Sequence, residues 1–241
     1  VSIADVKNSK KYDFSGPAKY DKETGYDTRS MLVVPMYNQK QEGLGVLQLI
    51  NAMDADGHVC AFSKEMALIL QSVASQAAIA IQNVQYMGNI KELFWSFVRV
   101  MSTAINKRTP YNVRHSEHMA ACAERFMEYL EKQKKRSFSP EQREELLISI
   151  WLHDIGKVGV SDAILCKDDK LTEEEFAVIR RHPEIGEKIL SCIDMFHNLG
   201  EIVRAHHERM DGGGYPDGLS GEQIPLEARM ISIADAFDAM M

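Results

Sequence analysis

The longest uniform feature of the sequence is a segment free of proline that begins after Ser63 and ends before Pro110. Apolar residues recur along it at alternating spacings of four and three. A repeat of this kind, kept over about five heptads, is typical of a coiled coil, and a helix of about 40 residues would be roughly 60 Å long. We therefore expect a connecting helix over 64–108 that forms a parallel homodimer through residues 66–105. The repeat consists of Met66, Leu70, Val73, Ala77, Ala80, Val84, Met87, Lys91, Phe94, Val98, Met101 and Ile105, of which Lys91 alone is not apolar.

The same pattern also fits a long helix that is broken near Gly88 and whose two ends are core helices of the flanking domains. In either interpretation Ser63 is the N-cap, since a serine side chain can accept a hydrogen bond from the first helical turn. A chain of 241 residues, 45% of them apolar and 26% charged, is long enough for two modest globular domains. We expect the segment to join those two domains.

The charge of the chain limits the partners that it can have. A formal net charge of -7 argues against general binding of nucleic acid or of an anionic membrane, because both normally need a basic face. The four cysteines form no CxxC pair, which favours a reducing cytosol, and no apolar run approaches the length of about 18 residues that spans a membrane. We expect a cytoplasmic protein. Its start at Val1 and its abrupt end at Met241 indicate a piece of a longer protein.

Two short runs rich in apolar and β-branched residues, 31–36 and 44–50, lie on either side of the polar stretch 38–43. Such a pair predicts a β-hairpin. Together with its neighbours the hairpin resembles the C-terminal half of a GAF domain, which implies an α+β GAF-like sensor fragment over 1–86. The motifs that carry this resemblance are Thr24–Ser30, Leu32–Pro35, Gly45–Asn51, Phe62 and Gln76–Asn83.

GAF domains that bind cyclic nucleotides carry an Asn-Lys pair followed by a Phe-x-Asp-Glu motif. In this sequence Ala52 follows Asn51, and Ser63-Lys64-Glu65 follows Phe62. Neither motif is present, so we assign no ligand to the fragment.

Five of the eight histidines and two of the aspartates, all after residue 105, occupy positions expected in helices or at loop edges. Imidazole and carboxylate groups together suit iron, manganese, zinc or nickel, and the lack of cysteine partners argues against a structural zinc site. These candidate ligands are His115, His153, Asp154, His182, His206, His207 and Asp235.

The run from 146 to 157 reads as an apolar helix that presents His153 and Asp154 at its end. Charged groups in an apolar element need a metal or another ion as partner. Neighbouring residues on a helix differ by about 100° in direction, so His153 can hold one metal while Asp154 bridges to a second. Lys157, four residues after His153, would share its helix face, or else cap the helix C-terminus. Taken alone, the His-Asp pair would be a chance dipeptide.

His182 is expected at the end of a helix. Thr172 and Glu175 form a capping box that starts this helix, which we expect to run up to His182, just before a proline. A further helix is expected over 185–190.

The last candidate ligands belong to two more expected helices. An amphipathic helix over 201–208 ends in the neighbouring residues His206 and His207, a pair that by itself more often faces solvent. An apolar helix over 226–237 carries Asp235 as an isolated carboxylate on its buried side.

From about Thr109 to its end, the sequence closely resembles the HD-GYP family, a subset of the all-helical HD phosphohydrolases. Several motifs in the family's order are far more specific than any one of them. The resemblance implies a mostly α fold, with an all-helical HD phosphohydrolase domain over 109–241 joined by the long helix to the GAF-like fragment. The shared motifs are His115-Ser116, Leu152–Lys157, Leu171–Phe176, His182–Gly186, His206–Glu208, Asp211–Pro216 and Ala234-Asp235.

This resemblance also implies a function for the site. The expected activity is a cyclic di-GMP phosphodiesterase that yields pGpG or GMP by attack of metal-bound hydroxide, regulated by the N-terminal GAF sensor in a bacterial cytoplasm. Two divalent transition metal ions are implied, with iron or manganese favoured over zinc or nickel. Asp154 would bridge them and Lys157 would meet the scissile phosphate. Metal ligation is implied for His115, His153, Asp154, His182, His206, His207 and Asp235.

A glycine-rich loop follows the histidine pair. Residues 211–218 include four glycines and a proline, which requires tight turns with positive φ beside the site. The resemblance implies that this loop passes over the substrate or docks a partner such as a diguanylate cyclase domain. Nearby arginines could contact phosphate. The loop candidates are Asp211, Gly212, Gly214, Tyr215 and Pro216, and the phosphate candidates are Arg180, Arg181 and Arg209.

Two departures from the family pattern affect these expectations. Some members bind a third metal through a carboxylate ahead of the first histidine, but residues 106–111 contain none, so we expect two metals. The family continues into an Arg-Pro-Tyr segment that this sequence does not reach, so we expect a domain that is incomplete at its C-terminus. The alternatives are a catalytically silent receptor or interaction module, and a phosphohydrolase for another cyclic dinucleotide. We expect His118, three residues after His115, at the surface, with a supporting contact to the metal site as the alternative.

Overall fold

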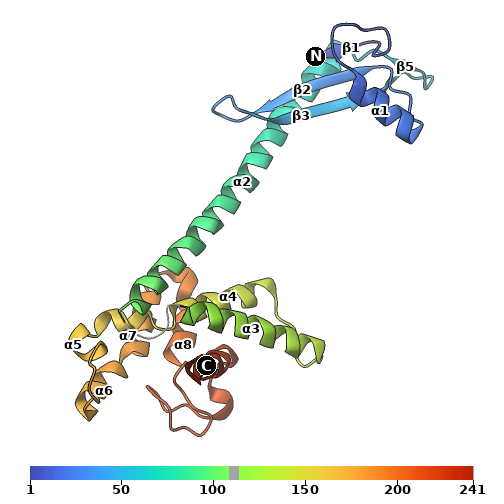
Figure 1. Ribbon diagram of the computed structural model, residues 1–241. Helices are drawn as coiled ribbons and strands as arrows, with labels where there is room; N and C mark the ends of the chain where they lie inside the picture. Colours follow the sequence, from blue (N-terminus) through green and yellow to red (C-terminus); the bar gives the residue numbers. More distant parts are fainter. Residues whose placement is uncertain (109–113, 241) are drawn as a thin grey trace. The chain divides into compact units, whose positions relative to one another are not determined.

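A computed structural model of the protein describes residues 1–108 and 114–240 (Figure 1). The chain divides into two compact units, Val1–Glu92 and Leu93–Met241. The first is a small α+β unit and the second is built from helices and loops. The predicted fold class, a helical domain preceded by an α+β fragment, is confirmed.

A three-stranded antiparallel sheet forms the centre of the first unit, with the strand order β1-β2-β3. The predicted hairpin is confirmed, because β2 pairs with β3 in a register that places Met31 opposite Ile50. Side chains from β2 and from the first turns of α2 make the core of this unit. The elements are β1 (Ser2–Ile3), α1 (Ser15–Thr24), β2 (Met31–Tyr37), β3 (Gly43–Ile50), β4 (Ala52–Met53), β5 (Val59–Cys60) and α2 (Lys64–Asn106).

Helix α2 begins where its predicted N-cap places it, since the Ser63 hydroxyl accepts a hydrogen bond from the backbone N–H of Met66 at 3.1 Å. It runs through Gly88 without a break. Its two ends belong to protein cores, with Leu70 buried in the first unit and Val98 buried in the second. The interpretation of the ends as core helices is therefore confirmed, while pairing of α2 with a second copy stays a prediction.

Helix α2 is also long and apolar enough to cross a membrane, judged by length and composition, and no other helix of the described residues is. Polar residues interrupt the apolar ones along this helix, so the sequence shows no uninterrupted apolar run of that length. Core helices of soluble proteins pass the same test, and both ends of α2 pack in such cores.

The second unit packs its helices around two apolar clusters. One lies between α3, α4 and α9, and the other joins the end of α2 to α4 and α8. Short 3-10 helices (η) lie between the longer elements. The elements are α3 (His115–Lys132), α4 (Pro140–Leu152), η1 (Ile155–Gly159), α5 (Asp162–Leu165), α6 (Glu173–Ile179), α7 (His182–Leu190), η2 (Asp194–Phe196), α8 (His197–Arg204), η3 (Gly221–Gln223) and α9 (Leu226–Met240).

Two helix boundaries differ from the sequence expectation. The predicted capping box of Thr172 is present, but α6 ends at Ile179, and His182 starts α7 rather than ending α6. Proline favours the first turn of a helix, where its missing N–H costs nothing, so the proline after His182 begins a helix here. Helix α8 likewise ends at Arg204, before the two histidines that were expected inside it.

Lys157 is also not where the sequence analysis placed it. Helix α4 ends at Leu152, and Lys157 lies in η1, so it does not share a continuous α-helical face with His153. The tight 3-10 turn lets η1 approach α7 very closely. A Cβ atom on Gly156 would lie 1.8 Å from the carbonyl oxygen of His182 and 2.6 Å from the backbone N of Gly186.

This contact predicts that Gly156→Ala strongly destabilises the second unit. Overpacking usually costs about 1–3 kcal/mol, and a backbone obstacle cannot move aside as a side chain can, so we expect a loss of at least about 3 kcal/mol. The melting temperature of the metal-free protein, followed by circular dichroism, should fall by about 6 °C or more.

Gly159→Ala is the matched control, because its Cβ would meet only the mobile end of the Ile185 side chain, at 2.9 Å. We expect a smaller loss of melting temperature for this variant. Equal melting temperatures for both variants would contradict the close approach of η1 to α7.

Candidate metal centre

Seven side chains from several elements meet at one place in the second unit. His115 begins α3, and His182 begins α7. Their potential ligand atoms fall into three groups, and within each group the atoms lie within 4.8 Å of one another. These groups are His115, His153 and Asp235; His153, Asp154 and His206; and His182, His206 and His207. The structure thus brings together all seven residues that the sequence nominated as ligands.

Asp154 occupies the middle of this arrangement. Its Oδ2 atom lies 3.3 Å from Nε2 of His153, and its Oδ1 atom lies 3.4 Å from Nε2 of His182. The two oxygens of one buried carboxylate therefore face histidines from opposite ends of the cluster. This is the geometry that a carboxylate bridging two cations requires.

Three of the histidines are oriented by the same type of hydrogen bond, from Nδ1 to a backbone carbonyl. Nδ1 of His153 donates to the carbonyl of Ile150 at 2.7 Å, and Nδ1 of His182 donates to that of Ile179 at 2.7 Å. Nδ1 of His206 donates in the same way to Val203 at 2.5 Å. In every case the acceptor is three residues earlier and lies in the last turn of α4, α6 or α8. The Nε2 atoms are left to face the site.

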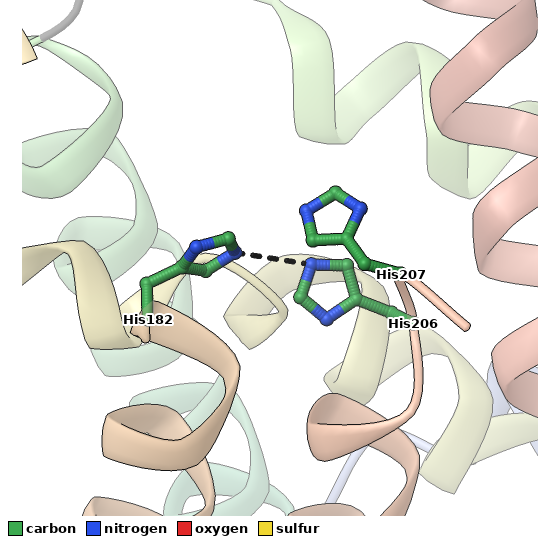
Figure 2. A group of neighbouring side chains, drawn as sticks. All are labelled: His182, His206 and His207. Atoms are coloured by element: carbon green, nitrogen blue, oxygen red, sulfur yellow. Dashed lines mark hydrogen bonds between the residues drawn. The ribbon is translucent and has the colours of Figure 1, made fainter. Parts of the chain in front are cut away.

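The Nε2 atoms of His182 and His206 face each other with no proton available between them (Figure 2). Their Nε2 atoms are 3.3 Å apart. Because a carbonyl can only accept, Nδ1 carries the proton of each neutral ring, and neither Nε2 has an N–H to donate. Two nitrogen lone pairs therefore point at each other in a buried place, and a cation between them would remove the repulsion.

Burial favours the neutral form of these histidines. It lowers the pKa of His206 well below its ordinary value, lowers that of His207 to about 3, and lowers that of His182 as well. Neutral imidazole is the form that binds a metal.

The pKa shifts of His153 and Asp154, at the centre of the site, follow their charged neighbours rather than their burial. Burial would lower the pKa of His153, but the nearby charge of Asp154 outweighs it and raises that pKa. Burial would raise the pKa of Asp154, but the charges of His153 and Lys157 hold it well below its ordinary value. The site therefore keeps an ionised carboxylate among histidines, which is a donor set suited to a divalent transition metal.

The His115 end is held by a residue that the sequence analysis missed. Nε2 of His115 lies 3.3 Å from Oδ1 of Asp235, and its Nδ1 lies 2.7 Å from Oδ2 of Asp238. The other oxygen of Asp238 lies 2.9 Å from Nδ1 of His118. The side chain of His118 is largely exposed, as expected, but it takes part in the site through Asp238. The spacing of Asp238 three residues after Asp235 was the available signal, since such residues share a helix face.

The cationic candidates already have neighbours. Lys157 Nζ donates to Oδ2 of Asp154 at 2.7 Å, and Arg209 forms an ion pair with Asp211 at 2.7 Å. The guanidinium of Arg180 lies over the rings of Phe176 and Tyr215. Arg181 is exposed at the N-cap of α7.

The glycine-rich loop lies beside the site, as predicted. The ring of Tyr215 is 4.8 Å from that of His207, and Gly212 and Gly218 have positive φ. Gly214 has no room for a side chain, because a Cβ there would lie 2.5 Å from the backbone of Glu208.

Glu208 anchors this loop, a role that the sequence analysis did not assign. Its carboxylate is buried and accepts backbone hydrogen bonds from Asp217 at 2.7 Å, Gly218 at 3.1 Å and Leu219 at 2.9 Å. The signal was an acidic residue directly after the histidine pair. Anchoring at this point fixes where the loop leaves the site.

The stretch examined for a third metal is only partly described. Asn106 Nδ2 donates to the hydroxyl of Ser116 at 3.0 Å. Residues 109–113 lie outside the described part of the chain, so the expectation of two metals rather than three rests on the sequence.

Comparison with known proteins finds two families. The HD domain model matches residues 99–241, and the GAF domain model matches residues 1–81. A cyclic di-GMP phosphodiesterase response regulator of Xanthomonas campestris is 52% identical over 92 residues, which cover 37% of this chain and 24% of the relative. A 3′3′-cGAMP-specific phosphodiesterase of Vibrio cholerae is 38% identical over 143 residues, which cover 59% of this chain and 30% of the relative.

The chain thus spans about a quarter to a third of the length of these relatives. Among solved structures, Bd1817, described as an HDG"Y"P protein from Bdellovibrio bacteriovorus, is 22% identical, with 52% of this chain and 40% of that chain covered. Its TM-score of 0.43 is too low to carry information on function.

The low pKa values of the buried histidines predict that acid destabilises the metal-free protein. His182, His206 and His207 stay neutral in the fold, whereas an unfolded histidine takes up a proton below about pH 6.5. Below that pH the unfolded state binds more protons, so stability falls as the pH drops toward the folded-state pKa of His207, which is about 3. His153, whose pKa is raised, acts in the opposite direction but is outnumbered.

Melting temperatures measured in a chelator should therefore fall between pH 7.5 and 5, before the carboxylates titrate. The His207→Asn variant should show a shallower fall, because it removes one of the three groups responsible. A flat profile for the unmodified protein would contradict the burial of neutral histidines.

Proposed function

Because the chain belongs to the HD domain family, whose model matches residues 99–241, we propose that it is a metal-dependent phosphodiesterase that hydrolyses cyclic di-GMP to pGpG or GMP. One observation carries the proposal: three overlapping ligand groups share His153 and His206, with Asp154 at the centre. The Xanthomonas relative, which is named a cyclic di-GMP phosphodiesterase, supports the substrate.

The residues present fit the divalent metal binding that the HD domain family implies. We propose two ions, with iron or manganese favoured and zinc or nickel as alternatives, since histidine and carboxylate ligands suit all four. When bound, two such ions would activate water and neutralise charge on the attacked phosphate. Asp154 would bridge the ions, one held by His115, His153 and Asp235, and the other by His182, His206 and His207.

The remaining side chains would bind and orient the substrate. We propose that Lys157, whose ammonium group is held by Asp154, meets the scissile phosphate. Burial raises the pKa of Tyr215 to about 12, so its hydroxyl keeps its proton and can donate a hydrogen bond near neutral pH. Arg180 lies over the same ring and supplies positive charge at the loop. We propose that residues 211–216 form one wall of the substrate site.

A second candidate substrate is a hybrid cyclic dinucleotide. The relative that is specific for 3′3′-cGAMP aligns with 143 residues of this chain, compared with 92 for the Xanthomonas relative. Both substrates present the same phosphodiester to the metal centre and differ in one base. The proposed chemistry is therefore the same for both.

We infer that the site is regulated through α2. In this proposal a GAF-like sensor portion covers 1–86, a connecting helix covers 64–108, and the phosphohydrolase domain covers 109–241. The buried hydroxyl of Ser102 near the end of α2 lies 3.0 Å from that of Ser116, the residue after His115. A shift in the last turns of α2 would therefore reach a proposed metal ligand through a single hydrogen bond.

The proposed activity can be tested with the full chain loaded with manganese or ferrous iron. We expect turnover of cyclic di-GMP or 3′3′-cGAMP, and a loss of at least about 100-fold in His153→Ala and Asp154→Ala, because the first removes a proposed ligand of one ion and the second removes the proposed bridge between the two ions. His58→Ala is the control, since His58 lies exposed in a turn of the first unit. Metal binding without turnover of either nucleotide would instead support the silent receptor or interaction module.

The proposed homodimer can be tested on the exposed middle of α2. The side chains of Val84 and Met87 belong to the predicted heptad repeat and are 74% and 66% exposed. We expect Val84→Glu combined with Met87→Glu to convert a dimer into a monomer in light scattering coupled to size-exclusion chromatography, because paired carboxylates would face each other across the interface. Asn89→Glu, which adds charge on the opposite side of the helix, should leave the dimer intact. A monomeric unmodified protein would refute the homodimer.

A further inference from the structure

Asp238 stands outside the proposed set of metal ligands and contacts one member of it directly. We propose that it is a positioning residue that fixes the ring of His115, and that the ion held by His115, His153 and Asp235 therefore depends on Asp238 while the other ion does not. This inference rests on the proposed metal centre.

The carboxylate of Asp238 is almost completely buried, with 7% of the residue exposed. Its Oδ2 atom is 2.7 Å from Nδ1 of His115, a distance typical of a strong hydrogen bond to a charged acceptor. Its Oδ1 atom is 2.9 Å from Nδ1 of His118. The carboxylate is thus held by both oxygens, so it cannot rotate away from His115 without breaking a second contact.

The position of Asp238 on α9 links it to a proposed ligand. Asp235 precedes it by three residues, so the two carboxylates lie on one face of the helix. Asp235 faces Nε2 of His115, while Asp238 faces Nδ1 of the same ring. One helix face therefore presents a carboxylate to each ring nitrogen of His115, and α9 sets the direction of the ring.

This support differs in kind from that of the other histidines. His153, His182 and His206 donate to neutral backbone carbonyls, whereas His115 faces a carboxylate. An anionic acceptor draws the Nδ1 proton more strongly and makes Nε2 a better electron donor to a metal. The two ends of the site therefore differ: His115 is supported by a side chain, whereas His182 and His206 at the other end are supported by backbone carbonyls.

The proposed difference between the two ion positions can be measured by titrating manganese into the metal-free full chain, with free manganese followed by electron paramagnetic resonance. We expect two binding events in the unmodified protein. Asp238→Asn keeps the size of the side chain and an oxygen that accepts from His115, but removes the charge. It should weaken one event by about 10–100-fold, the usual effect of losing a residue that supports a ligand, and leave the other unchanged. His207→Ala should weaken the other binding event, and so identify that event as the ion held by His182, His206 and His207.

Two variants serve as controls. Asp217→Asn makes the same chemical change in a carboxylate that pairs with Arg204 and contacts none of the proposed ligands, so both binding events should stay unchanged. His118→Ala removes the second contact of Asp238 but keeps the first, so it should weaken the same event as Asp238→Asn by a smaller factor.

The outcomes separate the two proposals. If the unmodified protein binds no manganese, the proposed metal centre itself fails. If it binds two ions and Asp238→Asn binds both as tightly, only the positioning role is refuted. Loss of both events in Asp238→Asn together with a lower melting temperature of the metal-free protein would show a general structural role, which also overturns the inference.

Discussion

The hydrogen bonds from histidine Nδ1 atoms to helix-end carbonyls determine where the site forms. The last carbonyls of an α-helix have no partner within the helix, and His153, His182 and His206 each satisfy one of them from three residues further along. This brings the C-terminal ends of α4, α6 and α8 toward one point. Helix C-termini carry partial negative charge, so their convergence favours a cation there before any ligand is counted. The same bonds fix the tautomer that presents Nε2 to that cation.

The part of the fold that depends on local signals could be read from the sequence. The hairpin of β2 and β3, the capping box of Thr172 and the N-cap of Ser63 were all predicted and are all present. Helix ends were predicted less well. His182 starts a helix because a proline follows it and favours the first helical turn, and its ring bonds to a carbonyl at the end of the preceding helix. Lys157 lies in a 3-10 turn where η1 passes close to α7, which is a tertiary contact.

In the candidate site, too, some residues could be predicted from the sequence and others were not. Its ligand residues could be nominated because several motifs occur in the order of a known family, and the structure places them together. The residues that support them, Asp238 and Glu208, were not nominated, because their spacing was a weak signal and the contacts through which they act form only on folding. Homodimerisation through α2 and docking of a diguanylate cyclase domain on the glycine-rich loop stay predictions, since both concern a second molecule.

Charge explains why substrate and metal should bind together. Asp154 and Asp235 place carboxylates beside the Nε2 atoms of the site histidines, where an anionic phosphodiester would have to arrive, in a chain whose net charge is already -7. Without cations these groups would repel the substrate, and the ammonium of Lys157 would be occupied by Asp154. If Asp154 shared its oxygens with the proposed cations, its hold on Lys157 would weaken, and the ammonium would be able to turn to a phosphate oxygen. In this proposal the positive charge that a phosphodiester needs would be supplied by the bound ions together with Lys157.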